Sequence, residues 1–280
     1  MQTLTLEGLE KTTGINNAYT FRLICNQCDK VSFKEYENPN NLLVFDTLND
    51  KLKEKMLMEM AIKTRLSHIS LKYKNAITKD IITNGEFSRL EKLGAFVPGE
   101  RIEMNSHFEA IDRMRYKYNN NKRLFKVLLN KELDYQTKIA TQTIISFNYD
   151  LYGKQIYDYN YISYDNQCSY FYLMILPYNG KTRIIFYIEE EYYIKVKNLI
   201  NQFQQMDLLE QIHFLFIALI LHDEQFYLTP SLAEYIKKRD KKIMRLYSKT
   251  EINLKFTRKI RDYKKYNNYL SKEYSNYGNE

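Results

Sequence analysis

The 280-residue chain is poor in the residues that mark several common classes of protein. It contains no tryptophan, eight glycines, four prolines and three cysteines. So few glycines and prolines leave room for few long, turn-rich loops. Three cysteines, two of them close together, exclude a disulfide-rich secreted scaffold and indicate a reducing compartment.

Long apolar segments are missing as well. The longest apolar run, Ile212 to Leu221, contains His213 and is half the length of about 20 residues that a membrane-spanning helix needs. The N-terminus, Met1 to Lys11, has no basic stretch followed by an apolar run, as a secretory signal would. We therefore expect a cytoplasmic protein without a membrane partner.

What the chain does have is enough apolar surface for a folded core, since 44% of its residues are hydrophobic and 15% are aromatic. Alternating side chains over 19–23 and 31–33 predict two strands around a tight turn, and Asn38 to Asn41 predicts a loop. A helix capped by Asn49 or Asp50 is expected next. Its apolar face comprises Met58, Ile62, Leu66, Ile69 and Tyr73.

Further helices and then strands follow. Helices are expected over 86–93, 105–118 and 122–130, with a break at 119–121. The period then changes to two, which predicts strands over 139–147, 156–164, 170–176 and 182–188. The last two strands flank Asn179 and Gly180, which suit the two positive-φ positions of a type I′ hairpin turn.

The C-terminal third is predicted to be mainly helical. Helices are expected over 191–203, over 207–222 with a capping box of Asp207 and Glu210, and over 231–247. Thr229 and Pro230 fit the N-cap and first position of the last of these. Residues 267–280 are expected to form a loose tail. The order of elements predicts an α+β fold with an antiparallel sheet, either as domains 1–130 and 131–280 or as one domain.

Cys25 and Cys28 form a Cys-x-x-Cys pattern between two expected strands. Thiolates at this spacing can hold one zinc ion as half of a tetrahedral site, with Cys168 and a histidine as the remaining candidates. A redox pair would instead be expected at the start of a helix. Two ordinary thiols in a hairpin are the third interpretation.

Histidine and carboxylate patterns give weak indications of catalysis. His107 and Glu109 have the His-x-Glu spacing of zinc deaminases, but the cysteine pair lies upstream, in the wrong order, and helix-surface side chains are the simpler interpretation. His222 and Asp223 offer metal ligands of the phosphohydrolase type, although the end of a helix followed by a polar loop explains them equally well. The acidic run 189–191 has the wrong spacing to Lys195 for a carboxylate nuclease.

Phosphate loops and nucleophile motifs are also missing. The eight scattered glycines form neither a dinucleotide-binding pattern nor a P-loop, and no serine or cysteine stands in a nucleophile signature. The sequence therefore leans away from an enzyme, and it identifies no catalytic residue.

Positive charge is concentrated in one segment. Lys237 to Lys265 contains thirteen Lys and Arg against three acidic residues, whereas the rest of the chain holds twenty-nine basic and thirty-one acidic residues. Such a segment, interleaved with tyrosine and phenylalanine, suits a phosphate backbone with bases stacked on the rings. The residues predicted to bind phosphate are Lys237, Lys238, Lys241, Lys242, Arg245, Lys255, Arg258, Lys259, Arg261, Lys264 and Lys265, and helical wrapping is expected to place Lys238, Lys241, Lys242 and Arg245 on one face.

The leading hypothesis is an accessory nucleic-acid-binding protein, for DNA or RNA, with a zinc ion at Cys25 and Cys28 as an optional structural element. The richness in Asn, Lys, Ile and Tyr is typical of an AT-rich genome, which suggests a low-GC bacterium, its phage or a mobile element. Phage defence or counter-defence would be a typical setting. The alternatives are an inhibitor or immunity factor that docks on an acidic or nucleic-acid-processing protein, a metal-dependent nuclease or phosphohydrolase, and a solvated basic helix without a partner.

Overall fold

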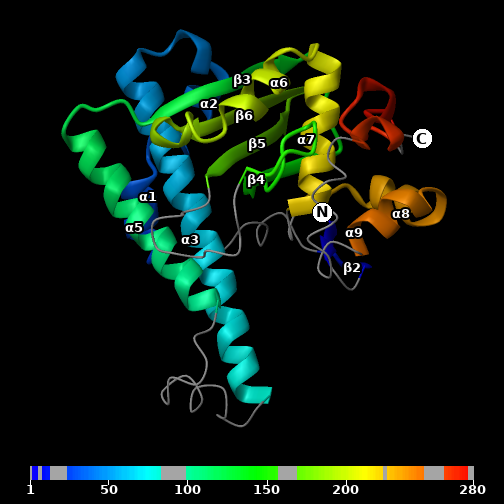
Figure 1. The fold of residues 1–280 in the computed structure, drawn as a ribbon, viewed down its shortest axis with the longest axis horizontal. Coiled ribbons are helices and arrows are strands. Elements are labelled where there is room, and N and C mark those ends of the chain that lie inside the picture. Colours follow the sequence, from blue (N-terminus) through cyan, green and yellow to red (C-terminus); the bar gives the residue numbers. More distant parts are fainter. Residues whose placement is uncertain are drawn as a thin grey trace. The chain divides into compact units, whose positions relative to one another are not determined.

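The computed structural model describes residues 2–5, 8–12, 24–82, 99–156, 169–222, 226–248 and 262–276. They form two compact units (Figure 1). One unit combines Met1–Ala18 with Lys126–Glu280 and contains the sheet, and the other is Tyr19–Phe125 and is helical. The expected α+β fold with antiparallel strand pairing is confirmed.

Within the described residues, the sheet has seven strands in the order β2-β1-β7-β4-β5-β6-β3. Their bounds are β1 Gln2–Thr5, β2 Gly8–Thr12, β3 Phe125–Leu133, β4 Ile139–Ser146, β5 Tyr170–Tyr178, β6 Lys181–Glu189 and β7 Tyr227–Leu228. Strands β4 and β5 and strands β5 and β6 pair antiparallel. The strands predicted over 139–147, 170–176 and 182–188 are therefore confirmed.

The β5–β6 turn is the hairpin that the sequence predicts. Asn179 and Gly180 have φ of 43° and 78°, and Tyr178 pairs with Lys181 on either side of them. Because asparagine and glycine tolerate positive φ, this turn twists in the same sense as the strands it joins. The local sequence thus sets the register of the central hairpin.

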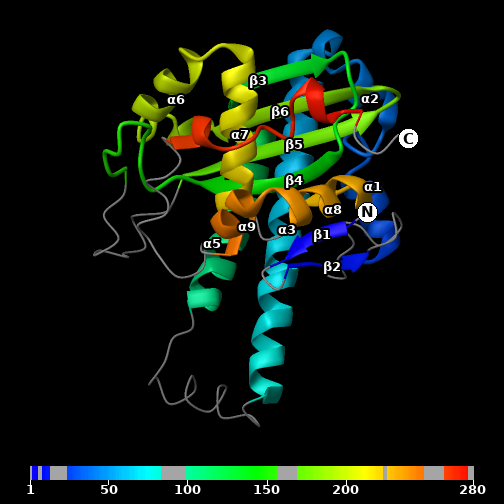
Figure 2. The same cartoon turned by 90° about the vertical axis from the view of Figure 1, so that its right-hand side faces the viewer.

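Two helices cover one face of the sheet: α6, Lys197–Gln204, and α7, Leu208–His222, which lies across the strands in Figure 2. Helix α7 begins as predicted, because the Oδ1 atom of Asp207 accepts a hydrogen bond of 2.8 Å from the Glu210 backbone amide. Phe214 on α7 stacks on Phe147, with ring centroids 5.5 Å apart. Burial of nearly the whole helix explains why α7 is apolar on all sides. The helix predicted over 191–203 is shorter, since residues 190–192 form a 3-10 turn before α6 begins.

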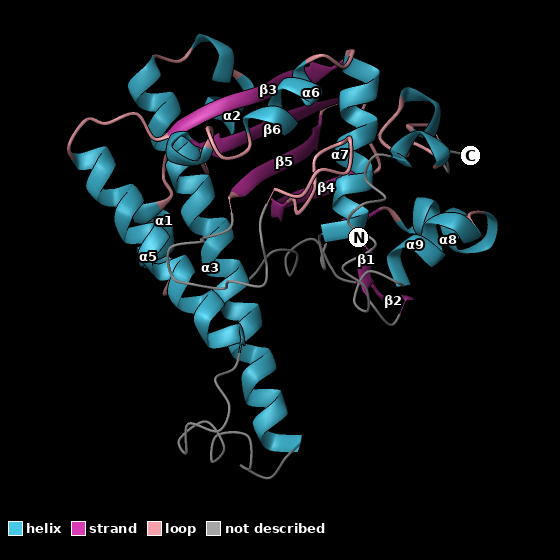
Figure 3. Ribbon diagram, viewed as in Figure 1, coloured by secondary structure: helices cyan, strands magenta, loops and turns pink. Residues whose placement is uncertain are grey.

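The helical unit contains α1, Asn26–Ser32, α2, Pro39–Leu43, the 3-10 turn η2, Phe45–Thr47, α3, Asp50–Ile82, and α5, Gly99–Asn119. Helices α3 and α5 pack along each other (Figure 3). Asn49 caps α3, because its Oδ1 accepts a hydrogen bond of 2.9 Å from the Leu52 amide. Met58, Ile62 and Ile69 are buried as predicted, whereas Tyr73 is 55% exposed.

Three local predictions are wrong, because a helix cap or a pairing strand decides the structure of each segment against the residue pattern. Residues 26–32 are helix α1, capped by Cys25, where a tight turn followed by a strand over 31–33 was expected. Residues 39–43 are helix α2, because Asn38 caps it and Pro39 suits its first position. Residues 125–133 form strand β3 beside β6, where a helix over 122–130 was expected, since cross-strand pairing overrides a weak helical spacing.

Some predictions lie outside the described residues: the strand over 19–23, the helix over 86–93 and nearly all of the strand over 156–164. The helix predicted over 105–118 is confirmed within α5, and Asn121 follows it with φ of 53°. Among the helices that the structure describes, none combines the length and hydropathy required to cross a bilayer.

Candidate functional site

The basic segment begins on a helix whose start is encoded locally. Helix α8, Pro230–Arg239, is capped by Thr229, whose Oγ1 accepts a hydrogen bond of 3.4 Å from the Leu232 amide, and Pro230 occupies the first helical position. Both features are as predicted. The single helix expected as far as residue 247 is wrong, however, because α8 ends at Arg239 and a second helix, α9, Lys241–Ser248, begins after Asp240.

Asp240 causes this break. Its backbone has φ of −114° and ψ of 74°, and its amide still donates to Ile236 O at 2.9 Å, which closes α8. Its Oδ1 atom accepts hydrogen bonds from the amides of Lys242 at 3.1 Å and Ile243 at 3.0 Å. Those amides have no partner within the first turn of α9, so the carboxylate acts as the N-cap of that helix.

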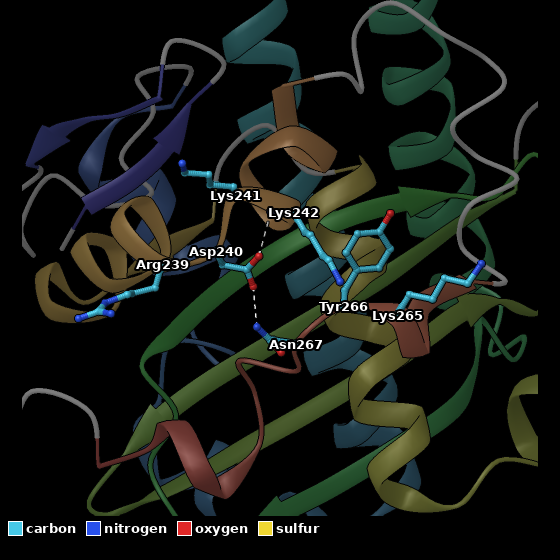
Figure 4. Close-up of a pocket in the computed structure, with 7 residues that line it drawn as sticks. All are labelled: Arg239, Asp240, Lys241, Lys242, Lys265, Tyr266 and Asn267. Carbon is cyan, nitrogen blue, oxygen red and sulfur yellow. Dashed lines mark hydrogen bonds between the residues drawn. The ribbon is translucent and has the colours of Figure 1, made fainter.

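The other carboxylate oxygen of Asp240 binds a distant part of the chain. Oδ2 accepts from Asn267 Nδ2 at 2.7 Å and from the Tyr269 hydroxyl at 2.9 Å (Figure 4). Burial raises the pKa of Tyr269 far above its ordinary value, so this phenol stays protonated and keeps donating. Asp240 is only 6% exposed, and its carboxylate is fully used in holding residues 267–269 against the α8–α9 junction.

Aromatic packing fixes the same segment to the core. Tyr263 meets Phe214 of α7 edge to face, with centroids 6.1 Å apart, and Tyr269 meets Phe216 in the same way at 5.6 Å. Tyr269, Leu270 and Tyr274 are buried. The loose tail predicted over 267–280 is therefore wrong for residues 267–276, because its aromatic side chains complete the hydrophobic core.

Between the helix junction and this anchored segment lies a pocket of about 360 Å³, here called the basic pocket. In the view of Figure 4, Lys242 extends beside the ring of Tyr266, whereas Arg239 and Lys241 extend on the other side of Asp240. Burial raises the pKa of Tyr266, with a smaller contribution from Asp262, so its hydroxyl is protonated at neutral pH. The lining residues are Arg239, Asp240, Lys241, Lys242, Lys265, Tyr266 and Asn267.

The cations of the basic pocket have few internal partners. Arg239, Lys241 and Lys242 are exposed, and none of them forms an ion pair with the acidic residues that the structure describes. Lys265 lies 3.2 Å from Asp262, but it is 72% exposed, and such surface pairs contribute little. Since both oxygens of Asp240 face inward donors, three or four positive charges remain available to a bound anion.

The location of two of these cations is unfavourable for the helix itself. Lys241 and Lys242 are the first two residues of α9, where the helix dipole is positive and basic side chains are destabilising by about 0.3–1 kcal/mol. By contrast, Lys237, Lys238 and Arg239 occupy the last turn of α8, where the dipole favours them. The helix dipole therefore favours the basic residues in the last turn of α8 but disfavours Lys241 and Lys242 at the start of α9.

The remaining residues predicted to bind phosphate fall into three groups. Lys238 pairs with Glu234 on α8 at 2.5 Å, and Lys264 pairs with Glu210 of α7. Lys237 and Arg245 are exposed on α8 and α9, so the predicted single face with Lys238, Lys241, Lys242 and Arg245 is divided between two helices. Lys255, Arg258, Lys259 and Arg261 lie outside the described residues.

Four residues that line the basic pocket were absent from the set predicted to bind phosphate: Arg239, Asp240, Tyr266 and Asn267. Asp240 had a detectable signal, because an aspartate followed two and three residues later by Lys242 and Ile243 fits the start of a new helix. The partnership of Asp240 with Asn267 spans 27 positions and has no local signal.

The cysteine pair lies in a different setting from the one expected. Cys25 is the N-cap of α1, and both Cys25 and Cys28 are exposed and free. Within the described ranges, no three His, Cys, Asp or Glu side chains converge as metal ligands. Cys168 falls outside those ranges, so the zinc site stays a prediction.

The weaker catalytic candidates are dispersed. His107 is buried rather than on the helix surface, and its Nδ1 lies 2.9 Å from Nη1 of the buried Arg65, whereas Glu109 is exposed. His222 is the last residue of α7, and Asp223 lies outside the described residues. Glu189 is buried and accepts a hydrogen bond of 2.8 Å from the Tyr172 hydroxyl.

Comparison with known proteins finds no matching family model, no matching curated protein and no matching solved structure.

Proposed function

We propose that this protein binds nucleic acid, and that the basic pocket at the α8–α9 junction holds the phosphate backbone. The observation that carries the proposal is the set of exposed cations, Arg239, Lys241 and Lys242, which lack a carboxylate partner in the described structure and surround a concave site. Clustered like charges repel one another, and a polyanion relieves that repulsion.

The proposed interaction is largely independent of base sequence. Ammonium and guanidinium groups that neutralise phosphates release condensed counterions, which makes binding strong at low salt and weak at high salt. A guanidinium such as that of Arg239 adds a two-pronged donor geometry that matches phosphate oxygens.

The shape of the site favours a single strand over a duplex. A pocket of about 360 Å³ is within the range that holds small ligands, and it is large enough for part of one nucleotide. Tyr266 lines it with a ring that lies beside Lys242, so a base can stack where the adjacent phosphate meets the cations. In a duplex, the bases are paired and cannot reach a ring in this position.

A role as an accessory factor of a low-GC bacterium, its phage or a mobile element is the setting that we propose with it. The composition supports this setting, since the chain is rich in Asn, Lys, Ile and Tyr. The proposal assigns no catalytic residue to the basic pocket, because Asp240, the one carboxylate among the described residues that line it, is committed to four hydrogen bonds.

Fluorescence anisotropy with a labelled single-stranded oligonucleotide and a duplex of the same length tests the proposal. The test variant carries Arg239→Glu, Lys241→Glu and Lys242→Glu. The matched control carries Lys131→Glu, Lys154→Glu and Lys197→Glu, which change the net charge equally at exposed positions outside the basic pocket.

The test variant is expected to bind the single strand at least about tenfold more weakly than the wild type, and the control less than about threefold more weakly. Equal losses in both variants would show that only net charge matters and would overturn the proposed site. Binding of poly-glutamate in preference to the oligonucleotide would replace nucleic acid with an acidic protein as the partner.

A further inference from the structure

The two exposed cysteines of the helical unit are arranged as a reactive pair. Cys25 has extended backbone angles, φ −73° and ψ 156°, and is the N-cap of α1. Its Sγ atom accepts a hydrogen bond of 3.3 Å from the Cys28 backbone amide. The sulfur of Cys25 therefore lies over the first turn, at the point where the Cys28 side chain begins.

The two cysteines also influence each other's ionisation. The Cys28 side chain is the largest influence that lowers the pKa of Cys25, ahead of the Cys28 backbone amide. The same interaction raises the pKa of Cys28. Because Cys25 Sγ accepts from the Cys28 backbone amide at 3.3 Å, the thiolate form is favoured at Cys25, which makes Cys25 the better nucleophile of the pair.

The exposure and the free state of both thiols also favour their reactivity. Both side chains are exposed and neither is in a disulfide. No metal-ligand group of three or more side chains includes them among the described residues. Solvent and small thiol reagents reach both sulfur atoms directly.

We propose that Cys25 and Cys28 form a reversible thiol–disulfide pair that exchanges with small disulfides such as oxidised glutathione. This site is independent of the nucleic-acid proposal and lies in the other unit of the chain.

The reaction has two balanced steps. The Cys25 thiolate attacks one sulfur of oxidised glutathione, forms a mixed disulfide and releases one glutathione thiolate. Cys28 then loses its proton to water and attacks the Cys25 sulfur, which forms the Cys25–Cys28 disulfide and releases the second glutathione thiolate. The protein dithiol is oxidised by two electrons, and oxidised glutathione is reduced to two glutathione molecules.

The full chain is incubated in buffers with a graded ratio of reduced to oxidised glutathione, quenched with acid, alkylated and cleaved with trypsin. Trypsin releases the peptide Leu23–Lys30, which contains both Cys25 and Cys28 and no other cysteine. A disulfide within this peptide makes it lighter by two hydrogens and blocks alkylation. We expect the disulfide fraction to rise with oxidised glutathione, to fall when reduced glutathione is restored, and to be unchanged by Cys168→Ser.

The roles of the two sulfurs are tested with single variants. With Cys28→Ser, Cys25 keeps the backbone amide and gains a hydroxyl donor, so iodoacetamide should alkylate it near neutral pH at least about threefold faster than it alkylates Cys28 in Cys25→Ser. Cys28→Ser should also accumulate the glutathione mixed disulfide, because its second step is blocked.

Several outcomes would overturn the proposal. These are a peptide that stays reduced in every buffer, a disulfide that joins either cysteine to Cys168, and purified protein with bound zinc whose cysteines oxidise only after chelation. Alkylation rates that are equal in Cys28→Ser and Cys25→Ser would overturn the assignment of Cys25 as the attacking thiol.

Discussion

The helical unit and the α8–α9 junction both contain basic side chains, but the two regions differ in whether acidic side chains pair with them. Lys63 on α3 is 19% exposed and pairs with Asp29 at 3.2 Å and with Glu37. Its ammonium group also lies 5.2 Å from the centre of the Phe33 ring. Lys55 on the same helix pairs with Glu35 at 3.3 Å. In the helical unit, lysine therefore joins α3 to the segments before it.

At the α8–α9 junction, the nearest acidic side chain is committed elsewhere. Asp240 is adjacent in sequence to Arg239 and Lys241, yet its oxygens accept from backbone amides, Asn267 and Tyr269. The comparison teaches that the number of lysines carries little information in a lysine-rich chain. What distinguishes a binding residue is whether the fold supplies the counter-charge.

The largest expected effect is that of Asp240→Ala. The substitution removes the N-cap of α9 and leaves the buried Tyr269 hydroxyl without its acceptor. We expect the free energy of unfolding to fall by about 2–4 kcal/mol. Urea denaturation followed by far-ultraviolet circular dichroism measures it, since the chain has no tryptophan.

Asp240→Asn is the matched control. Its amide oxygen can still cap α9, but its NH₂ group would face the donors of Asn267 and Tyr269, so an intermediate loss of stability is expected. If alanine and wild type unfold at the same urea concentration, the structural role assigned to Asp240 is wrong.

The next largest effect contrasts the two kinds of lysine directly. Lys63→Ala should lower the free energy of unfolding by about 1–2 kcal/mol, because a half-buried ammonium is removed from two carboxylates and an aromatic ring. Lys242→Ala should change it by less than about 0.5 kcal/mol, because that side chain has no described ion-pair partner. The same urea titrations compare both variants, and a larger loss for Lys242→Ala would reverse the distinction.

Much of the fold was predictable because its signals are local. The turn at Asn179–Gly180, the caps Asn49, Asp207 and Thr229, and the periods of α3 and β5 all lie within a few residues of the structure they specify. The wrong predictions concern segments whose structure depends on distant partners. Strand β3 exists because it pairs with β6, and residues 267–276 are ordered because their tyrosines complete the core.

The residues of the candidate site likewise divide into those that have a signal in the local sequence and those that do not. Lys241, Lys242 and Lys265 were identified from charge density alone. Arg239 was absent from the predicted set, and the break at Asp240 changes which side chains share a surface. Asn267 could not be found from sequence, since its role depends on a hydrogen bond to Asp240 across the fold.

The smallest expected effect is the pH dependence of stability that His213 causes. The His213 ring meets the ring of Tyr263. Burial lowers the pKa of His213, the nearby Lys264 lowers it further, and a backbone hydrogen bond with Tyr266 opposes both. The unfolded chain, with an ordinary pKa of about 6.5, therefore binds the proton more tightly than the folded chain. Stability from the neutral ring is complete above about pH 6.5 and is lost as the pH falls below it.

His213→Phe should remove this contribution while keeping an aromatic ring opposite Tyr263, whose centroid lies 5.2 Å from that of His213. Thermal unfolding of wild type and variant between pH 8 and pH 5 measures the difference. The stability of the wild type should decline more steeply with acidification, and parallel curves would contradict the assignment.

The salt dependence of nucleic-acid binding tests the central claim most directly. The affinity for a single-stranded oligonucleotide is measured over a range of salt concentrations for the wild type and for Arg239→Gln, Lys241→Gln and Lys242→Gln combined. If these side chains bind phosphates, the slope of log K against log salt should become shallower by about 0.7 for each phosphate that the variant no longer neutralises, or about 2 in total. An unchanged slope would mean that these cations do not neutralise phosphates.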